Sequence, residues 1–72
     1  MFNEKQLEFV IFLLHNLALE WNKEPSDVYK ILNDSNILDG YIIKCYDTLH
    51  TLGRQYLVND ITELVNERGI KI

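Results

Sequence analysis

The first third of the chain repeats apolar residues with the period of an α-helix. One set of them recurs at spacings of three and four residues and consists of Leu7, Val10, Ile11, Leu14, Leu17, Ala18 and Trp21. This spacing places the set on one face and predicts a helix from about Asn3 to Trp21. Asn3 suits the N-cap position, because its side chain can accept a hydrogen bond from a backbone N–H of the first turn.

Further apolar residues of the same segment lie off that stripe, namely Phe9, Phe12, Leu13 and Leu19. They make the predicted helix apolar over far more than the part of its surface that faces a core in most domains. Such a helix is either central in the fold or half covered by a partner. We therefore predict that the chain binds a partner protein or forms a homo-oligomer, and that the isolated chain self-associates or is only marginally stable.

Two shorter helices are predicted to follow. Pro25 suits the first position of a helix that ends near residues 33–36, where Asn, Asp and Ser gather. Asp39 can cap a third helix, for which Gly53 would be the left-handed stop after Leu52. The inward residues of that third helix would be Tyr41, Ile42, Cys45, Tyr46 and Leu49.

The C-terminal segment allows two interpretations. Residues 60–63, Asp-Ile-Thr-Glu, have the pattern of a capping box, which predicts a fourth helix that starts there and ends at Gly69. Alternatively, this helix begins near Arg54. Residues 56–58 and 70–72 have high β-propensity, so a two-stranded parallel pairing across the helix is also open. The predicted fold is all-α, a compact bundle of about four short helices, with a minimal two-stranded pairing near the C-terminus as the alternative.

Length and charge limit the classes of function. The 72 residues predict a single helical domain over residues 1–72 with a small core. The net charge is −4, and no window carries the basic stripe that phosphate binding needs, which argues against nucleic acid as a partner. The most apolar stretch, residues 7–19, is too short to span a bilayer, and the pattern of a signal peptide is absent. Together with a single cysteine, these features predict a cytoplasmic protein that does not associate with membranes.

We predict no catalytic, cofactor-binding or metal-binding residues. Cys45, Asp47 and His50 are the residue types of a cysteine nucleophile, its base and an orienting acid. On one helix, however, Cys45 and His50 are five residues apart and point in different directions. A metal site would have to add His15 to this set, in a spacing that matches no zinc pattern. We expect Cys45 to be a small apolar filler and the protein not to be an enzyme.

The aromatic residues are better candidates for function. Four tyrosines, one tryptophan and three phenylalanines exceed what one small core easily holds. Aromatic side chains with a polar tip are enriched at binding hot spots, although core packing of the tyrosines remains the alternative. The predicted protein-binding residues are Phe9, Phe12, Leu13, Tyr29, Tyr41, Tyr46, His50 and Tyr56.

Several segments together resemble a known family. The most specific is the Leu-His-Thr-x-Gly-x-x-Tyr run at residues 49–56, and it is accompanied by Phe-Val-Ile at 9–11, His-Asn-Leu-Ala at 15–18 and Asp-Val-Tyr at 27–29. The chain is similar over nearly its whole length to a small bacterial family of unknown function, whose members are often encoded beside a protein resembling ADP-ribosyltransferases. The resemblance implies an antitoxin-like or accessory role and supplies no catalytic residues.

The resulting hypothesis is a non-enzymatic protein-binding module, antitoxin-like or accessory to a partner protein. The alternative is a small regulatory DNA-binding protein, in which the second and third predicted helices form a helix-turn-helix. The third helix would carry only Lys44 as a base, and it lacks the Arg, Asn and Gln side chains that read base edges.

Overall fold

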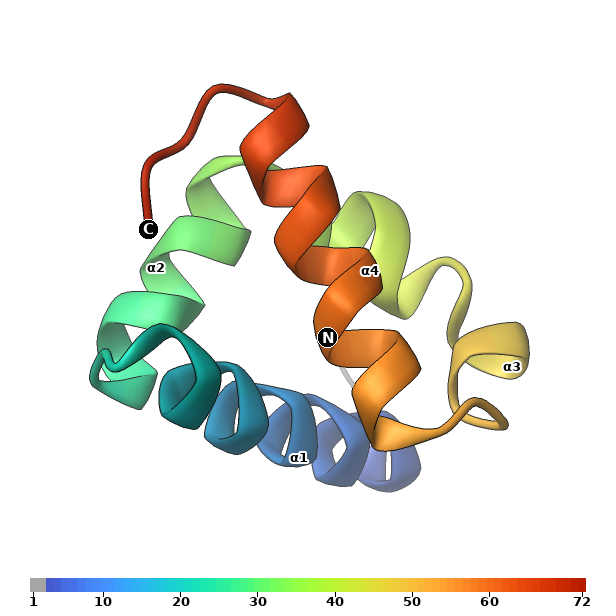
Figure 1. Cartoon of the computed structure of the whole chain (residues 1–72). Helices are drawn as coiled ribbons and strands as arrows, with labels where there is room; N and C mark the ends of the chain where they lie inside the picture. The colour runs from blue at the N-terminus through green and yellow to red at the C-terminus, as the bar shows by residue number, and fades with distance from the viewer. Residues whose placement is uncertain (1–2) are drawn as a thin grey trace.

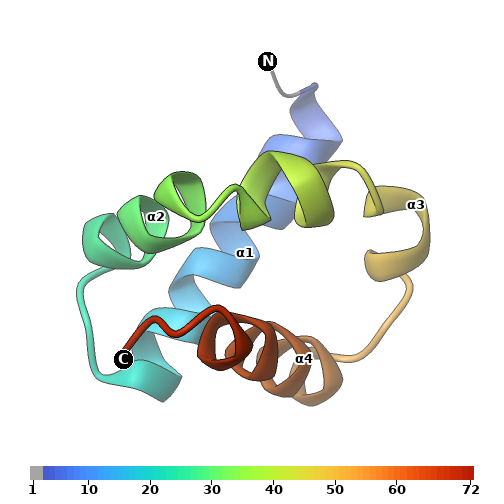
Figure 2. The ribbon, with the colours of Figure 1, turned by 90° about the horizontal axis from the view of Figure 1, so that it is seen from above.

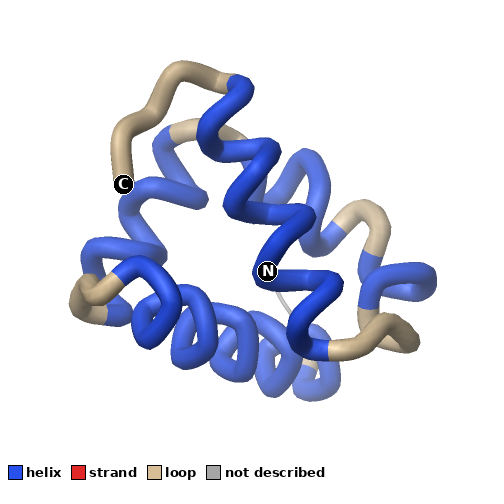
Figure 3. Tube along the Cα trace, in the orientation of Figure 1, coloured by secondary structure: helices blue, strands red, loops and turns tan. Residues whose placement is uncertain are grey.

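The computed structural model describes residues 3–72, which form five helices joined by short loops (Figure 1). In chain order they are α1 (Glu4–Trp21), α2 (Pro25–Asp34), the π-helix η1 (Leu38–Ile43), α3 (Tyr46–Leu49) and α4 (Arg54–Glu67). Residues 3–72 contain no strand (Figure 3). The all-α prediction is therefore confirmed, with five helices instead of four, and the two-stranded pairing is wrong.

The longest helix, α1, packs against both α2 and α4, which lie over opposite flanks of it when the molecule is viewed from above (Figure 2). The Asn3 side chain accepts a hydrogen bond of 2.8 Å from the backbone N–H of Gln6, and the Gln6 side chain accepts one of 3.1 Å from the backbone N–H of Asn3. This capping box begins the helix where the sequence predicted. Asn22, in the left-handed region at φ 55°, ends it.

The core face of α1 is rotated from the predicted stripe. Val10, Leu13 and Leu17 are buried, whereas Leu7 and Ile11 are 47% and 57% exposed. The assignment of Leu13 to a protein-binding surface is therefore wrong for the folded chain, because this side chain belongs to the core. Since α1 is apolar on nearly every side, periodicity alone could not choose between two overlapping stripes. Contacts with α2 and α4 make that choice.

The buried core draws on every helix. Its apolar members are Val10, Leu13, Leu17, Ala18, Val28, Leu32, Ile37, Leu38, Ile42, Leu49, Leu57, Val58, Ile61 and Val65. Pro25 occupies the first turn of α2, as predicted, and Asn36 at φ 63° turns the chain from α2 toward η1. A Cβ on Gly40 would lie 2.8 Å from Asn36 Nδ2, so glycine permits the close approach at this turn.

The predicted third helix is wrong, because the segment forms two pieces instead of one. The chain is a π-helix until Ile43, breaks at Cys45 (φ −103°, ψ 19°), and resumes as the four residues of α3. Gly53 has φ −72° and ψ 157°, an extended conformation. It precedes α4 as the N-cap residue and does not end a helix in the left-handed region. Ile42 and Leu49 are both buried, and the break lets each of them reach the core.

The fourth helix begins at Arg54, as the alternative interpretation held, so the capping box proposed at residues 60–63 is wrong. Asp60 lies inside α4, where its carboxylate accepts a hydrogen bond from the Tyr41 hydroxyl. Residues 56–58 are helical because Leu57 and Val58 belong to the buried stripe of α4. Gly69, at φ 78°, follows the helix end as predicted. None of the helices in the described part of the chain is both long and apolar enough to cross a membrane.

Candidate functional site

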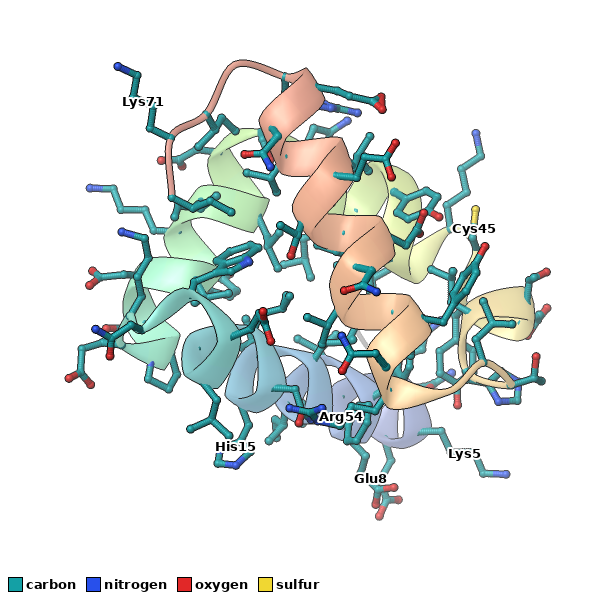
Figure 4. The ribbon with its side chains drawn as sticks, in the orientation of Figure 1. Lys5, Glu8, His15, Cys45, Arg54 and Lys71 are labelled. Carbon is teal, nitrogen blue, oxygen red and sulfur yellow. The ribbon has the colours of Figure 1, made fainter. Side chains whose placement is uncertain are left out.

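A shallow groove of about 440 Å³ lies between the N-terminal half of α1 and residues 46–52, which we call the α3 segment, with Leu57 of α4 also in its lining. Its lining combines aromatic and aliphatic side chains with two oppositely charged residues, and consists of Lys5, Glu8, Phe9, Phe12, Tyr46, His50, Leu52 and Leu57. Figure 4 shows Lys5 and Glu8 projecting outward from the end of α1 that lies nearest α3. The groove is thus apolar in its floor and charged along one rim.

Four aromatic rings form a continuous chain along this groove. Phe12 stacks on Phe9 with ring centroids 6.5 Å apart, and the edge of Phe9 meets Tyr46 at 5.5 Å with an interplanar angle of 78°. Tyr46 in turn stacks on His50 at 4.6 Å. Such contacts contribute about 0.5–1.5 kcal/mol each beyond the area they bury. Because a four-residue helix is unstable by itself, we attribute the position of α3 largely to Leu49 in the core and to these rings.

A buried amide fixes the groove floor to α4. The Asn16 side chain donates a hydrogen bond of 2.8 Å to the backbone carbonyl of Phe12, and its oxygen accepts one from Arg54 Nε. Asn16 is buried, yet both ends of its amide are satisfied, so its burial carries little penalty. Because Arg54 opens α4, this bridge places the start of α4 beside the part of α1 that carries Phe12. Asn16 was not among the predicted site residues, although a polar residue within an apolar helical run was the available signal.

The structure brings only part of the predicted protein-binding set together. Phe9, Phe12, Tyr46 and His50 line one groove. The other four residues lie elsewhere: Leu13 in the core, Tyr29 exposed on α2, Tyr56 exposed on α4 and Tyr41 half-buried on η1. The other lining residues were not predicted, because no local pattern indicates which distant parts of the chain pack beside the N-terminal half of α1. They are Lys5, Glu8, Leu52 and Leu57.

Tyr41 has a separate environment beside α4. Its hydroxyl donates to Asp60, and Glu63, Leu64 and Glu67 complete a smaller cleft there. The hydrogen bond to Asp60 is the main cause that raises the pKa of Tyr41 to about 12, and burial and the negative charge of Asp60 act in the same direction. The hydroxyl therefore stays protonated and remains a donor over the physiological range.

The residues considered for nucleophilic chemistry have different surroundings in the structure. Cys45 is half-buried at the break between η1 and α3, and Figure 4 shows it pointing away from Lys5 and Glu8. His50 instead stacks on Tyr46 in the groove. Within residues 3–72, no three His, Cys, Asp or Glu side chains gather closely enough to hold a metal ion. What the groove offers is an apolar floor, polar tips from tyrosine and histidine, and a charged rim.

Fold and groove together define a small all-α protein with an aromatic recess on its surface. The chain belongs to the DUF3791 family, described as proteins of unknown function, whose family model matches residues 8–68. That range contains every groove residue except Lys5. No curated protein and no solved structure matches the chain.

Proposed function

We propose that this chain is a non-enzymatic protein-binding module, antitoxin-like or accessory to a partner protein, and that the groove between α1 and α3 receives apolar side chains of that partner. The observation that carries the proposal is the chain of four aromatic rings along the groove. Its two inner rings, Phe9 and Tyr46, are half-buried, and the rings at its two ends, Phe12 and His50, are exposed. Aromatic residues at the centre of a recess are the common anchors of protein interfaces.

The shape of the groove favours a protein over a small molecule. Sites for small ligands enclose most of the ligand surface, whereas this groove is a shallow recess on the side of a helix. Lys5 and Glu8 on one rim can pair with charges of either sign on a partner and so orient it. The resemblance of the sequence to a family encoded beside ADP-ribosyltransferase-like proteins supplies the first partner to test.

The helix-turn-helix alternative has less support. Its second helix would have to be built from η1 and α3, which are separated by the break at Cys45. Between residues 37 and 49 the only base is Lys44, against Asp39 and Asp47. A surface with this charge balance repels phosphates. Fluorescence anisotropy with duplex DNA at physiological salt is expected to show no binding, and sub-micromolar binding that weakens steeply with salt would favour the alternative.

The direct test is capture of the partner followed by groove variants. The full chain, tagged at its C-terminus, is expressed in its native cells, and proteins that co-purify with it are identified. An ADP-ribosyltransferase-like protein, the kind of partner that the family resemblance implies, is tested alongside the captured proteins by titration calorimetry against the wild type, Phe12→Ala and Tyr46→Ala. We expect each variant to weaken binding by roughly tenfold or more, as hot-spot truncations do.

Tyr29→Ala is the matched control, because Tyr29 is 43% exposed and Phe12 is 41% exposed, but Tyr29 lies on α2 and not in the groove. This variant should bind within about threefold of the wild type. Circular dichroism must first show that all variants are folded. Folded groove variants with wild-type affinity would contradict the proposal, and so would equal losses in the control.

A further inference from the structure

The side of α1 that points away from the bundle has an apolar centre. Ile11 and Phe12 form this centre, Glu8 and His15 flank it, and all four side chains are exposed. Residues three, four and seven positions apart share one side of a helix, and Figure 4 shows Glu8 and His15 both pointing away from the bundle. We call these four residues the outward face of α1. Ile11 and His15 do not line the groove.

The four residues of the outward face can pair with the same four residues of a second copy when the two α1 helices run antiparallel. In a two-fold symmetric dimer, one surface patch meets an identical patch, so each contact occurs twice. An antiparallel copy of α1 with its axis between Ile11 and Phe12 sets Ile11 against Phe12 of the second copy. The same arrangement sets Glu8 against His15 of the second copy, and one turn further out it sets Glu4 against the exposed Leu19. Because imidazole has an N–H in either protonation state, the carboxylate can accept a hydrogen bond from it at both ends.

We propose that a second copy of this chain docks antiparallel on the outward face. A parallel copy would place like residues together, including Glu8 against Glu8, which is unfavourable. An anionic membrane surface is a poorer occupant, because the exposed side of α1 carries Glu4 and Glu8 and the chain has a net charge of −4. The polar pairing of Glu8 with His15, together with the avoidance of Glu8 against Glu8, thus favours the second copy in one orientation.

The expected dimer is weak. The helix α1 has 18 residues, and one face of one helix from each chain buries less than the roughly 1,200 Å² of a standard stable interface. We expect a Kd of roughly 10–300 µM. The dimer forms from the purified chain alone, whereas groove binding requires the partner protein, so failure of either proposal leaves the other standing.

Sedimentation velocity of the full chain over a concentration series up to about 1 mM tests the dimer, because that range brackets the expected Kd. His15→Glu sets Glu8 against a second carboxylate at both ends and should weaken association by about tenfold or more. The double variant Glu8→Lys/His15→Glu restores opposite charges and should return to within about threefold of the wild type. Glu8 and His15 are about 10 Å apart on their own helix, so rescue within one chain is small.

Ile11→Asp should abolish association, because it places a carboxylate at the centre of the face. Tyr56→Asp is its matched control, since Tyr56 is 60% exposed on α4 and Ile11 is 57% exposed, and it should associate like the wild type. A wild type that stays monomeric over the whole series overturns the proposal. Association that survives Ile11→Asp places the interface elsewhere, and a double variant that fails to recover rules out the antiparallel pairing.

Discussion

The hydrogen bond from the Tyr41 hydroxyl to Asp60 joins η1 to α4 and gives a quantitative test of the fold. Tyr41→Phe keeps the ring and its packing but removes the donor. A hydrogen bond to a charged group contributes about 1.5–3 kcal/mol when well shielded. Asp60 and Tyr41 are both partly accessible to solvent, so we discount this to about 1 kcal/mol. In a domain of this size that loss lowers the melting temperature by about 4–8 °C.

The same contact makes stability depend on alkaline pH. In the unfolded chain Tyr41 ionises near pH 10, and in the folded protein its pKa is about 12. Between these values the folded state binds more protons than the unfolded state, so the free energy of unfolding falls as pH rises. The contribution of Tyr41 is therefore complete below pH 10 and is lost as pH approaches 12.

Urea unfolding followed by the fluorescence of Trp21, the single tryptophan, measures both effects. The difference in unfolding free energy between the wild type and Tyr41→Phe should be about 1 kcal/mol at neutral pH and should shrink from pH 10 to pH 12. Tyr29→Phe is the control, because its ring is exposed on α2. A Tyr41→Phe variant within about 0.3 kcal/mol of the wild type at neutral pH would refute the reasoning.

Three further variants test local features by the same unfolding assay. Gly53→Asp should stabilise the fold by about 0.5–1 kcal/mol, because Gly53 is the N-cap residue of α4 and an aspartate there can cap the helix. An added Cβ at Gly53 meets nothing within 4 Å in the described structure. No gain in stability would contradict the assigned cap. Gly69→Ala should cost about 1 kcal/mol, because φ is 78° there, and a neutral result would remove the left-handed assignment. Thr62→Val should lower the free energy of unfolding by about 1 kcal/mol and change the fluorescence spectrum of Trp21, because Trp21 Nε1 donates a hydrogen bond of 2.8 Å to Thr62 Oγ1. An unchanged spectrum would show that this hydrogen bond is absent in solution.

The features that the sequence predicted well are those set by local chemistry. The start of α1 at Asn3, the first turn of α2 at Pro25 and the helix stop at Gly69 depend on backbone groups within a few residues. Each has a residue type whose conformational preference matches the observed dihedral angles or hydrogen bond. These signals were sufficient for the fold class and for most helix boundaries.

The features that the sequence missed depend on contacts between distant segments. Asp60 accepts a hydrogen bond from Tyr41 and does not act as a helix N-cap, because α4 packs with Asp60 beside η1. The split of the third helix follows from two buried residues, Ile42 and Leu49, on either side of a break that no Gly or Pro marks. For the site, aromatic content indicated Phe9, Phe12, Tyr46 and His50, but nothing local could separate them from Tyr29 or Tyr56.

We explain the many apolar residues of α1 by three adjoining surfaces of this helix, each of which needs apolar side chains. Leu13 and Leu17 face the core, Phe9 and Phe12 face the groove, and Ile11 lies on the outward face. A helix can be central in a fold and still present apolar surface, because α2, α4 and the α3 segment cover only part of its circumference (Figure 1). The two explanations considered from the sequence are therefore compatible, because the residues proposed for binding are not the ones that fill the core. Because Phe12 borders both the groove and the outward face, a groove partner and a second copy would compete for it, and partner affinity should fall at protein concentrations where the chain dimerises.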